Sequence, residues 1–507
     1  MRNLYPFGKA PFVILIIAII SGVVFGVMRL RENESRPDLI LAIQAEIHVK
    51  PYQKAIAQFN KENFVIDEKT GERRNARVVL QRVQKEVLMS RLQSAMQTGC
   101  DVPDVVEILE GTIGYFTRGP LENVGFVDLT ERLREDGLLD PKNMVQTRYP
   151  LWSSREHIFA LPHDVHPSCL CYRVDLIKEL GIDVTKLKTW DDFVKEGQRI
   201  TIPQKRYMID MADDSMISLI ILLSQHGFDL FDAYGNVAFD KPGVADVVAW
   251  FVKQTSGKTR IAFPAGDGQN FYQAMNEGLD LFFFTPDWRT AQFMLDNPRQ
   301  KGNLALMPMP VWADENGNQL PGTYQTGTWG GTGLAITKHS KNQDLAWKFA
   351  KYLYTKTEDL GERFLLTNIV PPIKASWELP EFKQKSDFYK HMFHDPATGE
   401  LVAEYVSIGE MYASQADGTP PRYVTAYTTQ AETQMLNVYY AAREYYNSAE
   451  YEKHGDKGLM ELIEKKLKEN ADYVRTLVAR NVFLSRDAEK AAAAKAEAAE
   501  TKSEQEQ

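Results

Sequence analysis

The chain has 507 residues, of which 44% are hydrophobic and 11% aromatic, and its 59 basic and 68 acidic side chains give a formal net charge of -9. It is long enough for two domains with well-filled cores, and its mild, interspersed acidity argues against a nucleic-acid-binding surface. The three cysteines, Cys100, Cys169 and Cys171, are an odd and small number for such a chain, so no disulfide framework is expected.

An uncharged apolar run, FVILIIAIISGVVFGVM, occupies residues 12–28 and follows Arg2 and Lys9. As a helix this run spans about 25 Å, which is close to the lower limit for crossing a membrane. No small-residue cleavage site precedes the charges that follow it, so the sequence favours a retained transmembrane anchor over a cleaved signal peptide, which stays open. Residues 1–37 are therefore predicted to be anchor or signal plus linker, with the rest of the chain exported. A lipid anchor directly after the run is excluded because the first cysteine is Cys100.

From residue 39 onward, strand patterns and helix patterns alternate, which is typical of α/β layers. The first series is predicted as a strand at 39–43, a helix around 52–59, a strand at 76–83, a helix at 87–96 ending near Gly99, and a strand at 102–109. This order with short connections predicts a parallel sheet whose ligand crevice lies at the carboxyl ends of its strands. Glu46, Glu107 and Glu110 fall near such ends.

The second series begins with strands at 158–162 and 170–173, followed by a helix at 174–180 that stops at Gly181. Thr189 and Asp192 have the spacing of a capping box and predict the start of the next helix. Later helices are predicted at 214–225, 242–253, 342–354 and 428–447. Residues 488–507 form a low-complexity Ala/Glu/Lys tail, for which a frayed helix or disorder is expected.

Three stretches of the chain carry a family resemblance. The densest, within 327–382, contains GTWGGTGLAITKHSKNQDLAWKFAKYL and FLLTNIVPPIKASWELPEF. The others are DLFFFTPDW at 280–288 and IFALPHDVHPSCLCYRVDLIKELGID at 158–183. In these stretches the chain resembles the extracellular solute-binding proteins of bacterial ABC importers, within the sugar-binding family 1 that includes maltose-binding protein. The resemblance covers roughly 39–447, with one departure at Arg173, where the family usually has Asn after the Tyr.

The resemblance implies an α/β fold of two lobes, of the periplasmic-binding-protein-like type II. The implied ranges are 38–163 and 331–370 for lobe 1, and 164–330 and 371–487 for lobe 2. The crossings between the lobes are implied near Asp164, Gly330 and Pro371. A solute held between the lobes favours the closed form, which a membrane permease recognises. The implied partners are a carbohydrate ligand and the permease subunits of an ABC transporter. The chain is expected to be monomeric, to need no cofactor or metal and to bind no nucleic acid.

A sugar presents C–H faces that rest on aromatic rings and hydroxyl groups that need directional donors and acceptors. Trp329, beside the turn glycine Gly330, and Trp288, beside Asp287, are the best candidates for such contacts. Tyr423, in the PPRY loop, is a further candidate. Each has a structural alternative: the tryptophans could cover the core, and Asp287 could be the N-cap of a helix.

The remaining predicted ligand contacts are acidic residues and histidines at strand ends and in the first crossing: Glu46, His48, Glu110, Asp164, His166 and Asp214. Acidic residues at such connections are frequently helix caps, so both interpretations stay open for them. A zinc-type spacing joins His166 with three further residues, His163, Cys169 and Cys171. Residues two apart on a strand share one face, whereas closure around one ion needs a loop. Buried cysteines without metal are therefore preferred.

Two other functions stay open beside transport. Paired carboxylates such as Glu107 and Glu110, or Asp213 and Asp214, are a weak glycosidase signal, because neighbouring residues on one strand or turn do not flank a scissile bond by themselves. The sequence has no nucleophile elbow, zinc-protease or phosphate-loop motif. We therefore expect a binding protein and not an enzyme. A membrane-anchored solute sensor built on the same bilobal module is the main alternative.

Overall fold

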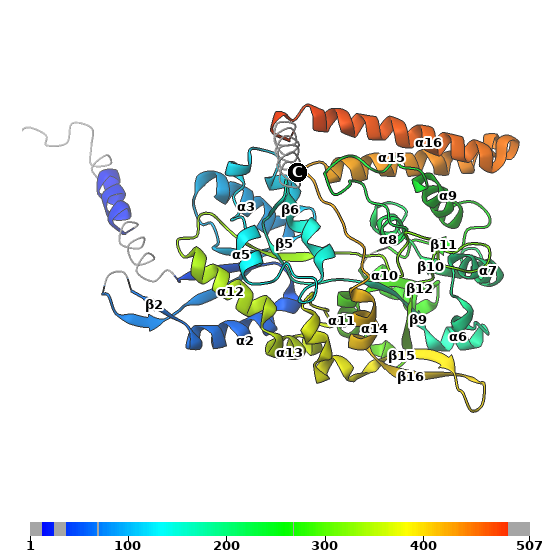
Figure 1. Cartoon of the computed structure of the whole chain (residues 1–507), viewed down its shortest axis with the longest axis horizontal. Helices are drawn as coiled ribbons and strands as arrows, with labels where there is room; N and C mark the ends of the chain where they lie inside the picture. Colours follow the sequence, from blue (N-terminus) through cyan, green and yellow to red (C-terminus); the bar gives the residue numbers. More distant parts are fainter. Residues whose placement is uncertain (1–12, 25–36, 68–69, 267, 485–507) are drawn as a thin grey trace, which may run out of the picture.

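The computed structural model describes residues 13–24, 37–67, 70–266 and 268–484. These residues form two lobes of mixed α/β structure, each built around one large β-sheet, with a pair of long helices along one side (Figure 1). The predicted tail at 488–507 lies outside the described residues.

Lobe 1 is built on a five-stranded sheet in the order β4-β1-β5-β14-β8. Its strands are β1 (Leu39–Ile43), β4 (Val78–Arg82), β5 (Val105–Leu109), β8 (Leu161–Pro162) and β14 (Thr332–Ile336). β1 pairs in parallel with β4 and β5, which confirms the predicted parallel core, whereas β14 runs antiparallel to β5 and β8.

Helices pack on this sheet and share its core with the strands and connecting segments. They are α2 (Glu46–Glu62), α3 (Lys85–Thr98), α4 (Thr112–Phe116), α5 (Thr130–Glu135), α12 (Gln343–Thr355) and α13 (Thr357–Thr367). The residues that predicted α2 are on its buried face, because Tyr52, Ile56 and Phe59 recur at helical spacing. The predicted helix end at Gly99 is confirmed, since this residue caps α3 with a left-handed φ of 68°. A small hairpin, β2 (Phe64–Ile66) with β3 (Arg73–Asn75), projects from the lobe (Figure 1).

Lobe 2 is built on a seven-stranded sheet in the order β11-β10-β12-β9-β13-β15-β16. Its strands are β9 (Ser168–Arg173), β10 (Tyr207–Asp210), β11 (Ala262–Phe263), β12 (Asp280–Pro286), β13 (Leu304–Pro308), β15 (Lys385–His394) and β16 (Leu401–Ser407). Its helices are α6 (Val174–Glu179), α7 (Trp190–Ile200), α8 (Ile217–Gln225), α9 (Val244–Thr255), α10 (Gln269–Glu277), α11 (Asp287–Asp296) and α14 (Ile408–Ala416). The β15–β16 hairpin was not predicted from the sequence.

The last described helices form an antiparallel pair over α9. They are α15 (Thr428–Tyr446), which was predicted, and α16 (Ala449–Ala479), which was not (Figure 1). α16 buries Leu459, Ile463 and Leu467 in the core of lobe 2. Its carboxyl end reaches lobe 1, where Asn481 Nδ2 donates to the carbonyl oxygen of Arg118 at 3.0 Å. The helix pair therefore contacts both lobes.

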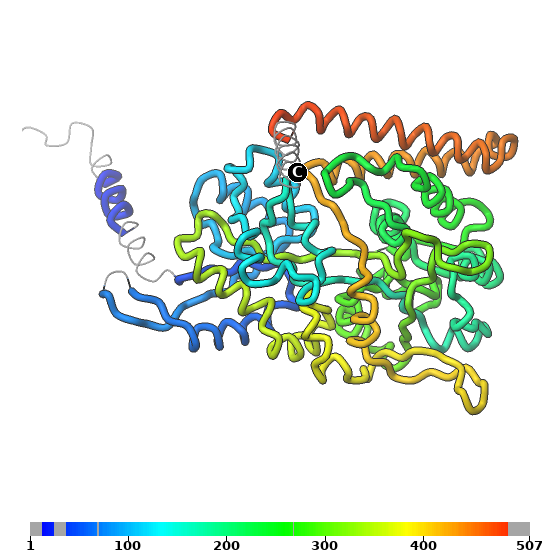
Figure 2. The backbone as a smooth tube through the Cα atoms, in the orientation of Figure 1, coloured from blue at the N-terminus to red at the C-terminus, as the bar shows by residue number. Residues whose placement is uncertain are grey.

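The chain crosses between the two sheets three times within the described residues. The first crossing is 163–167, the second 309–331 and the third 368–384. They lie side by side, because Pro167 pairs with Thr328 in an antiparallel bridge and the Val165 amide donates to the Val370 carbonyl at 3.0 Å. The segment 417–427 also runs between the lobes, from α14 to α15 (Figure 2). The lobe boundaries drawn from the sequence stay a prediction.

Near the N-terminus, residues 13–24 form a helix whose side chains are all exposed. Among the residues that the structure describes, no helix combines the length and the apolar character needed to span a membrane. The predicted anchor at 12–28 extends beyond these described residues at both ends.

The capping box predicted at the start of α7 is confirmed. Thr189 Oγ1 accepts from the Asp192 amide at 3.1 Å, and Asp192 Oδ2 accepts from the Thr189 amide at 3.1 Å. We expect Thr189→Ala to lower the free energy of unfolding by about 1 kcal/mol, because the Asp192 amide at the helix start loses the Thr189 hydroxyl as its acceptor. Urea unfolding followed by circular dichroism measures this change. Thr476→Ala, at an exposed position of α16, is the control and should change stability by about 0.5 kcal/mol or less.

Candidate ligand-binding site

A pair of half-exposed tryptophans lies where the second crossing meets α11. The rings of Trp288 and Trp329 are 5.2 Å apart between centroids and inclined at 74°. Trp288 Nε1 donates to the Trp329 carbonyl oxygen at 3.2 Å. The Arg289 guanidinium lies 4.9 Å from the Trp329 ring centroid. The two indoles therefore pack edge to face, held by a backbone hydrogen bond and a cation, and we call this pair the tryptophan platform.

The glycine beside Trp329 lets the backbone approach this platform closely. Gly330 has the positive φ expected from the sequence, at 96°. A Cβ atom there would lie 3.3 Å from His166 Cδ2 and 3.4 Å from Trp288 Nε1. A side chain would therefore be strained in its backbone and crowded against both rings.

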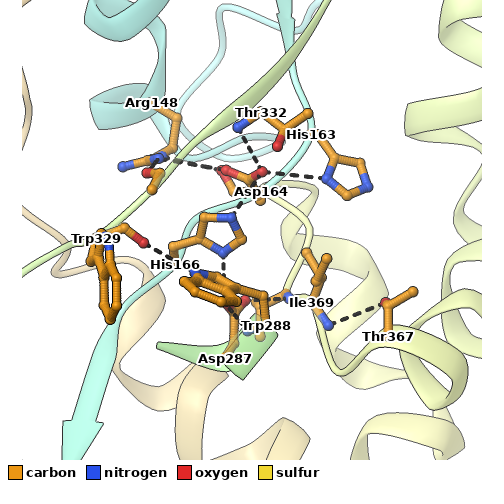
Figure 3. Close-up of polar contacts among 12 residues, drawn as sticks. Arg148, His163, Asp164, His166, Asp287, Trp288, Trp329, Thr332, Thr367 and Ile369 are labelled. Atoms are coloured by element: carbon orange, nitrogen blue, oxygen red, sulfur yellow. Dashed lines mark hydrogen bonds and ion pairs between the residues drawn. The ribbon is translucent and has the colours of Figure 1, made fainter. Parts of the chain in front are cut away.

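Behind the platform lies a buried ionic group that we call the hinge cluster, made of Arg148, His163, Asp164, His166 and Asp287 (Figure 3). His166 Nε2 lies 3.0 Å from Asp164 Oδ2, and His166 Nδ1 lies 2.5 Å from Asp287 Oδ1. The Arg148 guanidinium lies 3.5 Å from Asp164 Oδ1. All of these residues are at most 5% exposed. The predicted contacts Asp164, His166 and Asp287 thus bind one another and have little surface left for a ligand.

The electrostatics of the hinge cluster follow from these distances. Burial alone raises the pKa of Asp164, but His166 and His163 outweigh it and hold the pKa well below its usual value. Burial alone lowers the pKa of His166, yet Asp164 and Asp287 raise it to about 10. At neutral pH the cluster therefore holds two carboxylates against two cations.

A second buried polar group lies inside lobe 1, around Glu107 on β5. Its carboxylate accepts from Tyr52 Oη at 2.8 Å and Tyr354 Oη at 3.0 Å, and His48 Nδ1 lies 2.8 Å away. Burial alone raises the pKa of Glu107, but His48 and His163 lower it below its usual value. The predicted contact His48 is 3% exposed. It belongs to this internal network in the structure.

The other polar candidates lie at different places. Glu46 is exposed, and its carboxylate pairs with Arg82 at 2.7 Å. Asp214 is also exposed. Glu110 is half-buried, and its amide donates to the Gly331 carbonyl at 2.9 Å, which places it beside the second crossing. The structure thus brings Glu110 toward the tryptophan platform and leaves Glu46 as a surface ion pair.

The segment between α14 and α15 adds residues that the sequence did not indicate. Arg422 is buried and its Nε lies 3.2 Å from Asp229 Oδ2. Burial lowers the pKa of Arg422, but Asp229 and Glu110 raise it above its usual value. No local motif marks Arg148 or Asp229, and Arg422 stands in the PPRY loop without a local sign of its charge partner, because these partners are distant in sequence.

Next to Arg422, Tyr423 lines a cavity of about 220 Å³. Its aromatic and charged walls include Phe228, Tyr324, Tyr423, Asp229, Asp232 and Lys241. Ser224 lines the same cavity, and its Oγ accepts from the Thr328 amide at 3.3 Å. The cavity therefore adjoins the crossing that carries Trp329.

The four residues with zinc-type spacing do not converge. Cys169 and Cys171 lie on one face of β9, in an apolar core cluster with Phe283 and Phe293. His163 and His166 lie in the hinge cluster instead. Across residues 13–484, apart from the gaps in the description, no group of three or more His, Cys, Asp or Glu could hold a metal ion.

Two α/β lobes joined by three adjacent crossings, with an aromatic platform at their junction, define the class of bilobal solute-binding proteins. The family model of the bacterial extracellular solute-binding proteins matches residues 47–359, and the chain belongs to this family. The family consists of binding proteins, so the glycosidase alternative is set aside.

The chain is similar to curated relatives over most of its length. An arabinooligosaccharide-binding protein of Halalkalibacterium halodurans is 23% identical over 364 residues, covering 70% of this chain and 76% of the relative. An arabinooligosaccharide-binding protein of Bacillus subtilis is 24% identical over 299 residues, covering 59% of this chain and 66% of the relative.

Solved structures agree in fold. The sugar-binding protein MalE of Xanthomonas citri superposes with a TM-score of 0.64 at 17% identity, covering 87% of this chain and 98% of that one. The GacH receptor of Streptomyces glaucescens, solved unliganded and with acarbose, gives a TM-score of 0.60 at 15% identity, covering 86% and 98%.

Proposed function

We propose that this protein is the extracytoplasmic substrate-binding component of an ABC importer, which captures a sugar or oligosaccharide between its lobes and delivers it to a membrane permease. The observation that carries the proposal is the Trp288–Trp329 platform at the junction of the two lobes. The names of the curated relatives, both arabinooligosaccharide-binding proteins, support a carbohydrate ligand.

The ligand contacts that we propose are Trp288, Trp329 and the backbone at Gly330, with Glu110 and Tyr423. The indoles supply faces for a sugar ring, and Glu110 supplies an acceptor for hydroxyl groups. The cavity at Tyr423 provides room and aromatic walls for part of a longer ligand. His48, Asp164, His166 and Asp287 support this surface from below and do not touch the ligand.

Binding acts through closure of the lobes. Glu110 belongs to lobe 1, whereas Trp288 belongs to lobe 2, so a sugar that contacts both stabilises the closed form more than the open one. The closed form then docks on the permease. No covalent step is needed.

We also propose that the apolar run at 12–28 holds the protein at the outer face of the cytoplasmic membrane, and that the protein acts as a monomer. The length of the run supports membrane anchoring, and membership of an extracellular solute-binding family supports the outer face. Carbonate-resistant membrane association of the full chain, lost when residues 1–37 are removed, is the expected result.

A carbohydrate screen tests the proposed ligand class. We expect one group of oligosaccharides, among arabinooligosaccharides, maltooligosaccharides and polyols, to raise the melting temperature of residues 38–487. A ligand at 100 times its Kd stabilises the native state by about 2.7 kcal/mol. Differential scanning fluorimetry measures the shift, and loss of uptake of the same sugar on gene deletion links it to transport. Intact uptake with lost sugar-dependent signalling would instead support the sensor alternative.

A further inference from the structure

His166 is held in a backbone conformation that non-glycine residues seldom adopt. Its φ is 56°, in the left-handed region. Such a conformation costs free energy and persists only where the surrounding structure fixes it. The contacts of the His166 side chain identify what does so.

The His166 ring bridges two carboxylates from different parts of the chain. Asp164 belongs to the first crossing, and Asp287 starts α11. Both ring nitrogens contact a carboxylate, at 3.0 Å and 2.5 Å. A neutral imidazole has one N–H, so both contacts are hydrogen bonds from the ring only when it carries two protons.

Each carboxylate also accepts backbone hydrogen bonds, as an ionised group does. Asp164 Oδ2 accepts from the Thr332 amide at 2.8 Å. Asp287 Oδ2 accepts from the Val370 amide at 2.7 Å. Thr332 follows the second crossing and Val370 lies in the third, so the bridge through His166 joins all three crossings (Figure 3).

The same bridge reaches the tryptophan platform. Asp287 Oδ1, which contacts the His166 ring, also accepts from the Trp288 amide at 2.7 Å. Gly330 lies beside both rings, since a Cβ there would be 3.3 Å from His166 and 3.4 Å from Trp288, and Trp288 Nε1 in turn donates to the Trp329 carbonyl. The His166 ring therefore reaches Trp288 through Asp287 and reaches the backbone beside Trp329 through Gly330.

We propose that His166, bound between Asp164 and Asp287, is a positioning residue that fixes the crossings to α11 and thereby sets the Trp288–Trp329 platform. It acts through Asp287 and Gly330 and does not touch the ligand. This inference rests on the proposed sugar site. Its test needs no sugar, so a failure of sugar binding can be told apart from a failure of His166 to position the tryptophans.

The test is ¹⁹F NMR of the full chain in detergent, with all 8 tryptophans replaced by 5-fluorotryptophan. Trp288→Phe and Trp329→Phe assign the two platform signals. His166→Asn removes the ring that bridges Asp164 and Asp287, and asparagine tolerates the left-handed backbone conformation. We expect it to move the Trp288 and Trp329 signals and to leave the others in place. His157→Asn is the control, because His157 pairs with Asp128 at the surface, and should move neither signal. A folded His166→Asn with unmoved platform signals would overturn the proposal.

A pH titration of the protein without any substitution provides a second measurement that does not depend on how the variant folds. The His166 ring contacts Asp164 and Asp287, and Asp164 is contacted in turn by Arg148 and His163. Two-bond ¹H–¹⁵N spectra should show His166 doubly protonated at pH 7 and losing its proton near pH 10. The platform signals should shift over the same pH range. A neutral His166 ring at pH 7 would contradict the proposal.

The sign of the pH effect on stability follows from the direction of the shift. The pKa of His166 is raised from 6.5 in a free side chain to about 10 in the folded protein. Its contribution to stability is therefore fully present below about pH 6.5 and is lost as the pH rises through about 10. The stability difference between the wild type and His166→Asn should shrink over this interval, and a difference that grows with pH would have the wrong sign.

Discussion

Replacing Arg148 by methionine is expected to lower the free energy of unfolding by about 3–5 kcal/mol, because it leaves two buried carboxylates with His166 as the one remaining cation of the hinge cluster. Arg148 lies in the 3₁₀ helix η2 (Gln146–Trp152) and is 0% exposed. Its guanidinium donates to the Asp164 carbonyl at 3.1 Å, to Thr328 Oγ1 at 3.1 Å and to the Gly330 carbonyl at 2.9 Å. Methionine fills similar space but donates no hydrogen bond.

Urea unfolding measures this loss, and two further variants sharpen it. Arg134→Met is the matched control, because Arg134 is exposed and pairs with Glu131 in its own helix. It should cost about 1 kcal/mol or less. Adding Asp164→Asn to Arg148→Met should recover part of the loss, since the unpaired charge is then removed. Equal costs for Arg148→Met and Arg134→Met would show that the hinge cluster contributes little.

The second large effect is expected on ligand affinity. Trp329→Ala should weaken binding of the best sugar from the carbohydrate screen by about thirtyfold or more, corresponding to about 2 kcal/mol. The change removes the indole ring that packs against Trp288, whereas the Trp329 backbone carbonyl that accepts from Trp288 Nε1 remains. Isothermal titration calorimetry measures the dissociation constant directly.

The control for this variant is Trp250→Ala. Trp250 is also partly buried, but it lies on α9 against Trp190 and Trp312, away from the platform. This variant should reduce stability more than Trp329→Ala does and leave sugar affinity unchanged. Trp329→Phe should retain part of the affinity, because an aromatic face remains. An unchanged dissociation constant in Trp329→Ala would remove this residue from the ligand site.

The parts of the fold that the sequence predicted are those with strong local signals. The apolar run at 39–43 specified β1, Gly99 specified the end of α3, and Thr189 with Asp192 specified the start of α7. Each signal acts within a few residues, so no knowledge of distant contacts is needed.

The missed elements lack such signals. α16 has a narrow buried stripe among charged residues, and Gly455 interrupts its backbone with a φ of 58°. The β15–β16 hairpin has few fully buried positions, and its register shifts between Lys385 and Lys390. α16 packs first on its neighbour α15 and then on α9, and β15 and β16 pair mainly with each other, so both elements depend on tertiary packing more than on intrinsic propensity.

The site was predicted in composition but not in arrangement. Trp288 and Trp329 were found from aromatic residues beside turn and cap positions, and they lie together in the structure. Asp164, His166 and Asp287 were also found, but as ligand contacts. His166 and Asp287 are 121 residues apart, and the cation Arg148 has no motif of its own. Sequence alone cannot show that a charge is neutralised internally when its partners come from distant segments.

The end of α16 connects the two lobes and so restrains their separation. The helix is rooted in lobe 2, yet Asn481 binds the Arg118 carbonyl in lobe 1, and Arg118 Nε donates to the Ala426 carbonyl at 3.1 Å. Separating the lobes about the three crossings strains these two partly exposed hydrogen bonds, which together contribute about 1–3 kcal/mol. The contact of α16 with lobe 1 therefore adds a small restraint on the separation of the lobes.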